Sequence, residues 1–253
     1  MQNTKKQPVT LDPPENITIG IGLFYCLVGF FIVPYLFIMI LNGMAPSLKA
    51  YSWVELGFHT MNFCFVFGLF REYLQDSWYG FATQKKAIFR IVGFAVLAML
   101  VAYGAIYLYC KSSAPSMKLL AIYGTLPLTD MGMTSLSSSL VQTNPLAAML
   151  IFVVFSPFIC ACLFYAAAFL PAFNKHPLLG YLAVAVITIL PHYSNANTLW
   201  NAETQTILYW SQLPIHLVAC WSYHKTDSIF APMLSLAGAN LISCGWILLQ
   251  PIL

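Results

Sequence analysis

The sequence predicts an all-α fold, a polytopic membrane helix bundle of about seven transmembrane helices. Of its 253 residues, 60% are hydrophobic and 8% are charged, and the mean hydropathy is +0.76. Soluble domains carry about 25% charged residues, and so small a share cannot cover a surface that faces water. The net charge of +3 is only the remainder of 11 basic and 8 acidic residues. These observations exclude a soluble globular domain, a disordered chain and a nucleic-acid-binding module.

Apolar runs of nearly span length recur along the chain. A bilayer core of about 30 Å needs roughly 20 mainly apolar helical residues, and open strands would leave their backbone groups unpaired in lipid. The predicted helices are residues 17–41, 53–70, 87–109, 146–170, 178–190, 205–223 and 229–249. The fifth reaches full length only if it extends through Pro177 and Pro191. We therefore expect a tail at residues 1–16 and one transmembrane domain at residues 17–253.

Basic residues predict the orientation of these helices, because Lys and Arg are retained on the cytoplasmic side. With seven spans and a cytoplasmic N-terminus, eight basic residues lie inside and Lys49, Lys111 and Lys118 lie outside. An eighth span at residues 118–142 would change this ratio to six against five. Seven spans are favoured, with residues 118–142 in the interface. Residues 71–79 mix charges with aromatic rings, which predicts a cytoplasmic helix at headgroup level that anchors the helix ends.

Ionisable residues within the apolar runs are few, and each is a candidate functional residue. Glu55 and His59 are four residues apart and share a helix face, and Asn62 lies close to that face. They predict either a proton or ion path or a polar clamp between helices, and the absence of a second carboxylate favours the clamp. The seven cysteines lack the spacing of a metal site, and no Gly-rich phosphate loop is present. No cofactor or metal is therefore expected.

Two segments resemble a known family. Residues 223–234 read YHKTDSIFAPML, and Asn240 follows. This resembles the tail motif of the CPBP family (CAAX prenyl protease and bacteriocin-processing proteins, also called Abi), in which Y-x-[KR]-T-G-S-[IL]-[WF]-A-P-[IM]-[IL] opens a helix with H-x-x-x-N or H-x-x-x-D. Residues 156–159, SPFI, are similar to the start of the first family motif, A-P-[IV]-x-E-E-x-x-F-R-G. His192 follows Pro157 by 35 residues, close to the position of the F-x-x-x-H histidine. The resemblance covers residues 146–249.

The chain departs from the family pattern where the family keeps its catalytic groups. The paired glutamates fall at Cys160 and Ala161, the arginine at Tyr165, the second-motif phenylalanine at Thr188 and the last histidine at Leu236. Of the family's polar positions, His192 and Asn240 remain. In active relatives the glutamate and histidines are thought to activate a water molecule, and neither a thiol nor a methyl group replaces a carboxylate as that base. A Cys160 nucleophile paired with His192 is disfavoured, because thiols in apolar helices are usually inert.

The resemblance therefore implies a catalytically degenerate member of the family, a pseudoprotease in the bacterial cell membrane. Its expected role is a scaffold or regulator that binds a partner membrane or envelope protein. Two alternatives stay open. One is an active intramembrane peptidase that uses His192, Asn240 and an acid such as Glu203 or Glu55. The other is a small transporter or ion path through Glu55, His59 and Asn62.

Overall fold

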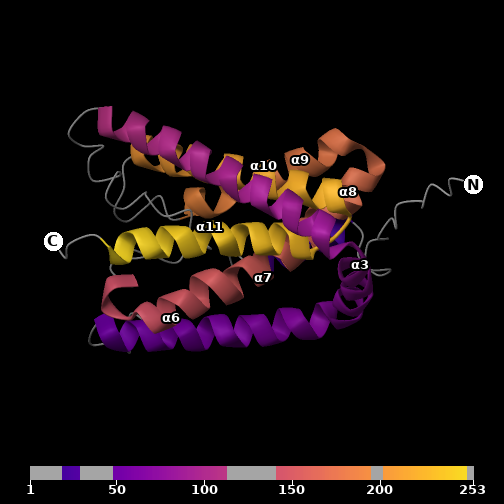
Figure 1. Ribbon diagram of the computed structural model, residues 1–253, viewed down its shortest axis with the longest axis horizontal. Helices are drawn as coiled ribbons and strands as arrows, with labels where there is room; N and C mark the ends of the chain where they lie inside the picture. The colour runs from indigo at the N-terminus through magenta and orange to yellow at the C-terminus, as the bar shows by residue number, and fades with distance from the viewer. Residues whose placement is uncertain (1–18, 29–47, 113–140, 195–201, 250–253) are drawn as a thin grey trace, which may run out of the picture.

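The computed structural model describes residues 19–28, 48–112, 141–194 and 202–249, and this part of the chain is helical and contains no strand (Figure 1). The all-α prediction is thus confirmed for these residues. The N-terminal tail and residues 113–140, which hold nearly all of the candidate eighth span, lie outside them. The elements are α1 (Ile19–Leu27), α3 (Leu48–Ser112), α6 (Pro145–Met149), η2 (Leu150–Phe155), α7 (Ser156–Cys160), η3 (Ala161–Phe169), α8 (Leu170–Lys175), α9 (Pro177–Ser194), α10 (Ala202–Thr226) and α11 (Phe230–Leu248).

Two helices of the described part are long and apolar enough to cross a membrane. They are the continuous helix Pro145–Lys175, formed by α6 to α8, and α11, Phe230–Leu248. Helix α9 contributes a shorter apolar stretch, Pro177–Thr188. It begins at Pro177 and passes Pro191 before it ends at Ser194, so the fifth predicted helix extends through both prolines. The count of seven spans stays a prediction.

The second and third predicted helices form one helix, α3, which folds back on itself. A straight helix of 65 residues would be about 100 Å long, but α3 bends at the charged and aromatic segment, and α11 lies between its two arms (Figure 1). The ring of Phe81 packs 5.2 Å from that of Phe230 and 5.9 Å from that of Phe89, and Trp78 meets Phe230 edge-on at 5.5 Å. The predicted headgroup-level helix is therefore the bend of α3, held by aromatic contacts to the start of α11.

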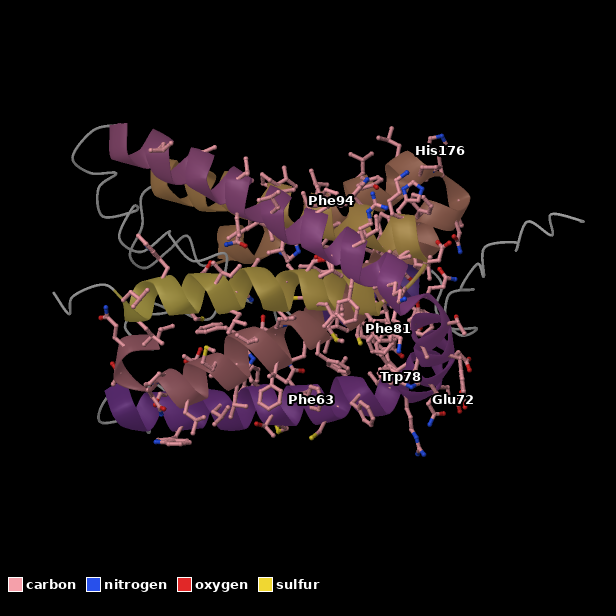
Figure 2. The ribbon with its side chains drawn as sticks, in the orientation of Figure 1. Phe63, Glu72, Trp78, Phe81, Phe94 and His176 are labelled. Carbon is pink, nitrogen blue, oxygen red and sulfur yellow. The ribbon has the colours of Figure 1, made fainter. Side chains whose placement is uncertain are left out.

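Charge is concentrated at one end of the bundle. That end holds residues 71–90, which include the bend of α3, together with the junction of α8 with α9 and the turn between α10 and α11. Glu72 and His176 are marked there (Figure 2). Among charged residues whose side chains are described, only Glu55 lies elsewhere. The basic residues of these segments are Arg71, Lys85, Lys86, Arg90, Lys175 and Lys225, and the acidic ones are Glu72, Asp76 and Asp227.

The helix Pro145–Lys175 forms the centre of the core. Every residue from Ser156 to Ala172 is buried, and α1, α9, α10 and α11 pack around this segment. Two parts of the helix, η2 and η3, are π-helical. Such wide turns are rare, and inside α-helices they often mark functional sites. The central helix is also the one that carries the first motif of the family resemblance.

The turn between α10 and α11 has an unusual backbone. Asp227 adopts a φ of 48°, the left-handed region that glycine occupies most readily. The CPBP turn pattern has glycine at the corresponding position, whereas this chain has aspartate there. Burial raises the pKa of the Asp227 carboxyl above its ordinary value, and the nearby His224 opposes that shift.

Candidate functional site

The residues that the resemblance sets at the family's catalytic positions lie in the packed core. Cys160 ends α7 and Ala161 begins η3, and their exposed fractions are 1% and 0%. Tyr165 follows one turn later, and Leu236 on α11 belongs to the same hydrophobic cluster. The buried hydroxyl of Thr188 donates a hydrogen bond to the carbonyl of Val184 in its own helix. These positions therefore hold closely packed side chains and no carboxylate.

Two of the candidate polar residues are only partly placed. His192 lies in the last turn of α9 and Glu203 near the start of α10, while their side chains lie outside the described part. Whether His192 approaches Asn240 stays a prediction.

Asn240 supplies a hydrogen bond that the central helix lacks. Its Nδ2 donates to the carbonyl oxygen of Phe152 over 2.7 Å. In η2 the N–H of Ser156 bonds to the carbonyl of Ile151, five residues back. The next residue in this series is Pro157, which has no N–H to offer to Phe152. A buried carbonyl without a donor is costly in a core, so Asn240 completes the backbone pairing that Pro157 interrupts.

Tyr165 and His216 form a second buried polar contact between helices. The hydroxyl of Tyr165 lies 2.8 Å from Nδ1 of His216 on α10, and the ring of Phe164 packs 5.0 Å from the imidazole. Tyr165 occupies the position of the family's arginine. The sequence pointed to Tyr165 but gave no sign of its pairing with His216, because the two residues are 51 positions apart.

A third polar contact joins α3 to α10. The hydroxyl groups of Tyr73 and Tyr223 form a hydrogen bond inside the core. Tyr223 is the first residue of the turn motif, and Tyr73 lies in the bend of α3. The first residue of the motif therefore holds the bend of α3 against α10. The spacing of 150 residues left no sequence signal for this pair.

The three polar residues of the first arm of α3 are all buried. The exposed fractions of Glu55, His59 and Asn62 are 1%, 4% and 5%. Nearby, Nδ2 of Asn144 donates to the hydroxyl of Ser52 over 2.9 Å. Nδ1 of His59 and Nδ2 of Asn62 have no hydrogen-bond partner among the described residues. Buried polar atoms of this kind are usually paired with protein or water. This face of α3 therefore places polar groups inside the bundle that are able to bond to water or to a ligand.

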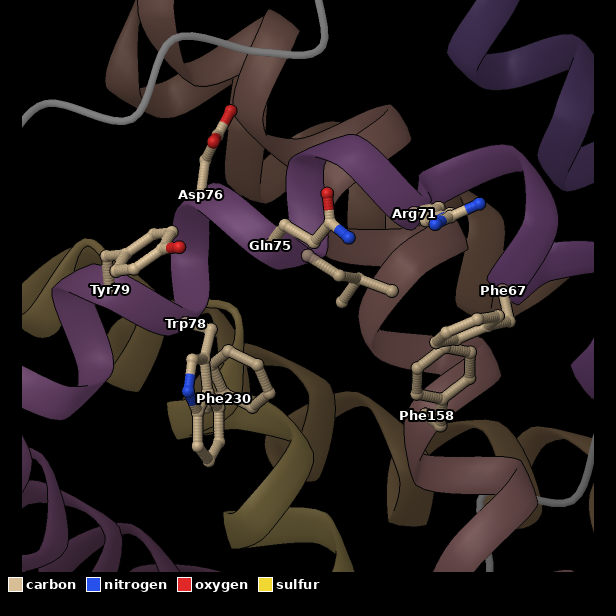
Figure 3. A pocket seen from close by; sticks show the side chains of 9 residues that line it. Phe67, Arg71, Gln75, Asp76, Trp78, Tyr79, Phe158 and Phe230 are labelled. Carbon is tan, nitrogen blue, oxygen red and sulfur yellow. The ribbon is translucent and has the colours of Figure 1, made fainter.

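A cleft opens at the bend of α3 (Figure 3). Its volume is about 480 Å³. The sequence indicated the mixture of charges and rings at residues 71–79 but not that they border a cleft, because Phe158 and Phe230 come from distant segments. The lining residues are Phe67, Arg71, Leu74, Gln75, Asp76, Trp78, Tyr79, Phe158 and Phe230.

The site as a whole defines a helical protein with structural polar contacts in its core and a cleft at its charged end. Among the described residues, no group of three His, Cys, Asp or Glu side chains is arranged to hold a metal ion. Comparison with protein-family models, with curated proteins and with solved structures gives no match. The resemblance to the CPBP family therefore rests on the motifs quoted above.

Proposed function

We propose that this chain is a non-catalytic membrane protein of the CPBP type, which binds a partner membrane or envelope protein as a scaffold or regulator. One observation carries the proposal: the positions where the family keeps its catalytic groups are filled by core packing. Cys160 and Ala161 replace the glutamates and are buried. Tyr165 forms a hydrogen bond with His216, and Asn240 donates one to the carbonyl of Phe152. A water-activating base needs a suitable group beside the water, and these residues do not supply one.

Two features support a placement across the bacterial cell membrane. Described charge gathers at one end of the bundle and is mainly basic, as expected for cytoplasmic connections. Large apolar side chains are exposed along the helices, among them Phe65, Phe94, Leu97, Leu182 and Trp246. Such extensive exposure of apolar side chains fits lipid as the surrounding solvent. The two arms of α3 then count as separate spans, which gives the proposed seven helices with the N-terminus in the cytoplasm.

The binding role has a physical basis in the same bundle. An intramembrane protease admits a substrate helix between its own helices, and helices recognise one another through packed faces. Such a face does not depend on the catalytic carboxylates. With Cys160 and Ala161 in place of the glutamates, cleavage of a peptide bond is lost, while binding of a partner helix persists.

The His192→Ala variant tests this proposal. We expect it to retain the same partner as the natural chain after purification from the native membrane in mild detergent, because partner binding needs no histidine base. Mass spectrometry of the co-purified proteins checks this result. His176→Ala serves as the control, since His176 is an exposed histidine at the junction of α8 and α9. An uncut precursor peptide that accumulates only with His192→Ala would contradict the proposal and indicate the peptidase.

A second candidate function, an ion or proton path, is favoured by the unpartnered Nδ1 of His59 and Nδ2 of Asn62. Purified protein in proteoliposomes would then carry a pH-dependent flux that Glu55→Gln abolishes, whereas the exposed Glu72→Gln leaves it unchanged. Our main proposal expects no such flux in either variant or in the natural chain. A flux lost only with Glu55→Gln would replace the scaffold by a transporter.

A further inference from the structure

The cleft at the bend of α3 has an apolar floor and a polar rim. Its floor includes Phe158 from α7 and Phe230 from α11. Phe67 lies 6.3 Å from Phe158, measured between ring centres, and Trp78 closes the other side against Phe230. The rim carries Arg71, Gln75, Asp76 and Tyr79, all exposed (Figure 3). An amphipathic ligand, with an apolar and a polar part, matches this division.

The two charges of the rim do not neutralise each other. Arg71 and Asp76 point in different directions from α3 (Figure 3), and neither forms an ion pair or hydrogen bond with any other side chain of the described part. A guanidinium fork recognises phosphate oxygens well. A carboxylate accepts charge-assisted hydrogen bonds from the N–H groups of a primary ammonium group. The rim thus offers separate partners for a phosphate and for an ammonium group.

We propose that this cleft binds one phospholipid whose headgroup is zwitterionic and carries a primary amine, the phosphoethanolamine type. Its phosphate contacts Arg71, its ammonium group contacts Asp76, and an acyl chain covers Phe67 and Phe158. The volume of about 480 Å³ lies within the usual range of small-molecule sites. A glycerol headgroup could place the same phosphate at Arg71, but it would offer only neutral hydroxyl groups to Asp76, and a quaternary amine would have no N–H to donate there.

The site rests on the proposed membrane placement, because that placement puts the charged end of the bundle at the level of the headgroups. Since the lipid would touch the bend of α3, α7 and α11, it also joins three segments that are distant in the sequence. An acidic peptide of a partner protein is the competing occupant for Arg71. It is disfavoured because Asp76 lies on the same rim and would repel it.

Native mass spectrometry of the full-length chain in detergent tests the proposal, with phosphatidylethanolamine, phosphatidylcholine and phosphatidylglycerol added in turn. We expect phosphatidylethanolamine to bind about tenfold more tightly than the other two, the effect of one charge-assisted contact. Arg71→Gln should weaken its binding about tenfold, and Asp76→Asn should remove the preference over phosphatidylcholine. Glu72→Gln, which changes a neighbouring exposed charge that does not line the cleft, should change neither.

Equal binding of the three lipids, or unchanged binding in the Arg71 and Asp76 variants, would overturn the lipid site. Tight binding of soluble glycerophosphoethanolamine would overturn it too, since no acyl chain would then be needed. Preferential capture of an acidic peptide that the lipid cannot displace would assign the cleft to a protein partner. Fractionation of cells separates this inference from the proposed function: recovery of the chain outside the membrane would contradict both, whereas a membrane-embedded chain without lipid preference contradicts only the lipid site.

Discussion

Replacement of Asn240 by leucine is expected to destabilise the folded protein by about 1–2 kcal/mol. Leucine has the same branching and the same number of side-chain heavy atoms but no N–H to donate, so the buried carbonyl of Phe152 loses the bond that it accepts over 2.7 Å. Hydrogen bonds between membrane helices average less than this, about 0.6 kcal/mol. The larger value applies here because Pro157 cannot supply a donor in place of Asn240. Thermal unfolding in mild detergent measures the loss.

A double-mutant cycle isolates the cause. In Pro157→Ala the new backbone N–H can bond to the Phe152 carbonyl, in the same five-residue pattern that joins Ser156 to Ile151. The Asn240→Leu change should then cost close to nothing in the Pro157→Ala background. We therefore expect a coupling energy of about 1 kcal/mol between two positions that are 83 residues apart in the sequence.

The control is Ser235→Ala on the same helix. The hydroxyl of Ser235 is buried as well, but it donates to the carbonyl of Ala231 within α11 and so joins no second helix. We expect it to change stability much less than Asn240→Leu does. If the effects of Pro157→Ala and Asn240→Leu on the free energy of unfolding were additive, the two residues would act independently. Asn240 would then not compensate for the N–H that Pro157 lacks.

The positions of two helices were predictable from the sequence, because apolar runs of span length indicate them directly. The predicted helix at residues 146–170 lies within Pro145–Lys175, and the one at 229–249 nearly coincides with α11. The continuity of α3 was not predictable. The charged segment at residues 71–79 resembles a connection between helices, yet it keeps helical hydrogen bonds while it bends. The aromatic contacts to Phe230 that accompany this bend come from a segment about 150 residues away.

The candidate site was predictable only in its composition. Burial of Glu55, His59 and Asn62 follows from their helical spacing, and the sequence already showed that Cys160 and Ala161 hold no carboxylate. The partners of Tyr165, Tyr223 and Asn240 could not be predicted, since a side chain that bonds across helices leaves no periodic pattern. Asn240 is the example. The family motif has a polar residue at this position, and in this chain Asn240 donates to the carbonyl of Phe152, which lacks a backbone donor because residue 157 is proline.

Replacement of Gly22 by alanine should separate α1 from the central helix, with a loss of about 1–3 kcal/mol, the usual cost of forcing an extra group into a packed core. Gly22 lies against the backbone of η3, and a Cβ atom at this position would overlap the carbonyl group of Ala167. Because the obstacle is backbone and not a flexible side chain, α1 must move as a whole. Small residues commonly allow such close approach between membrane helices, and η3 offers three alanines in a row at Ala166, Ala167 and Ala168.

Gly20 provides the matched control, since it lies in the same helix and a Cβ atom there would have no neighbour within 4 Å. Gly20→Ala should therefore leave stability unchanged or raise it by about 0.5–1 kcal/mol, because alanine favours the helix more than glycine does. The same chemical change two residues apart is thus expected to have opposite signs. Thermal unfolding of both variants in detergent measures this difference. Equal effects at the two positions would contradict a backbone contact at Gly22, and helix propensity alone would then explain both.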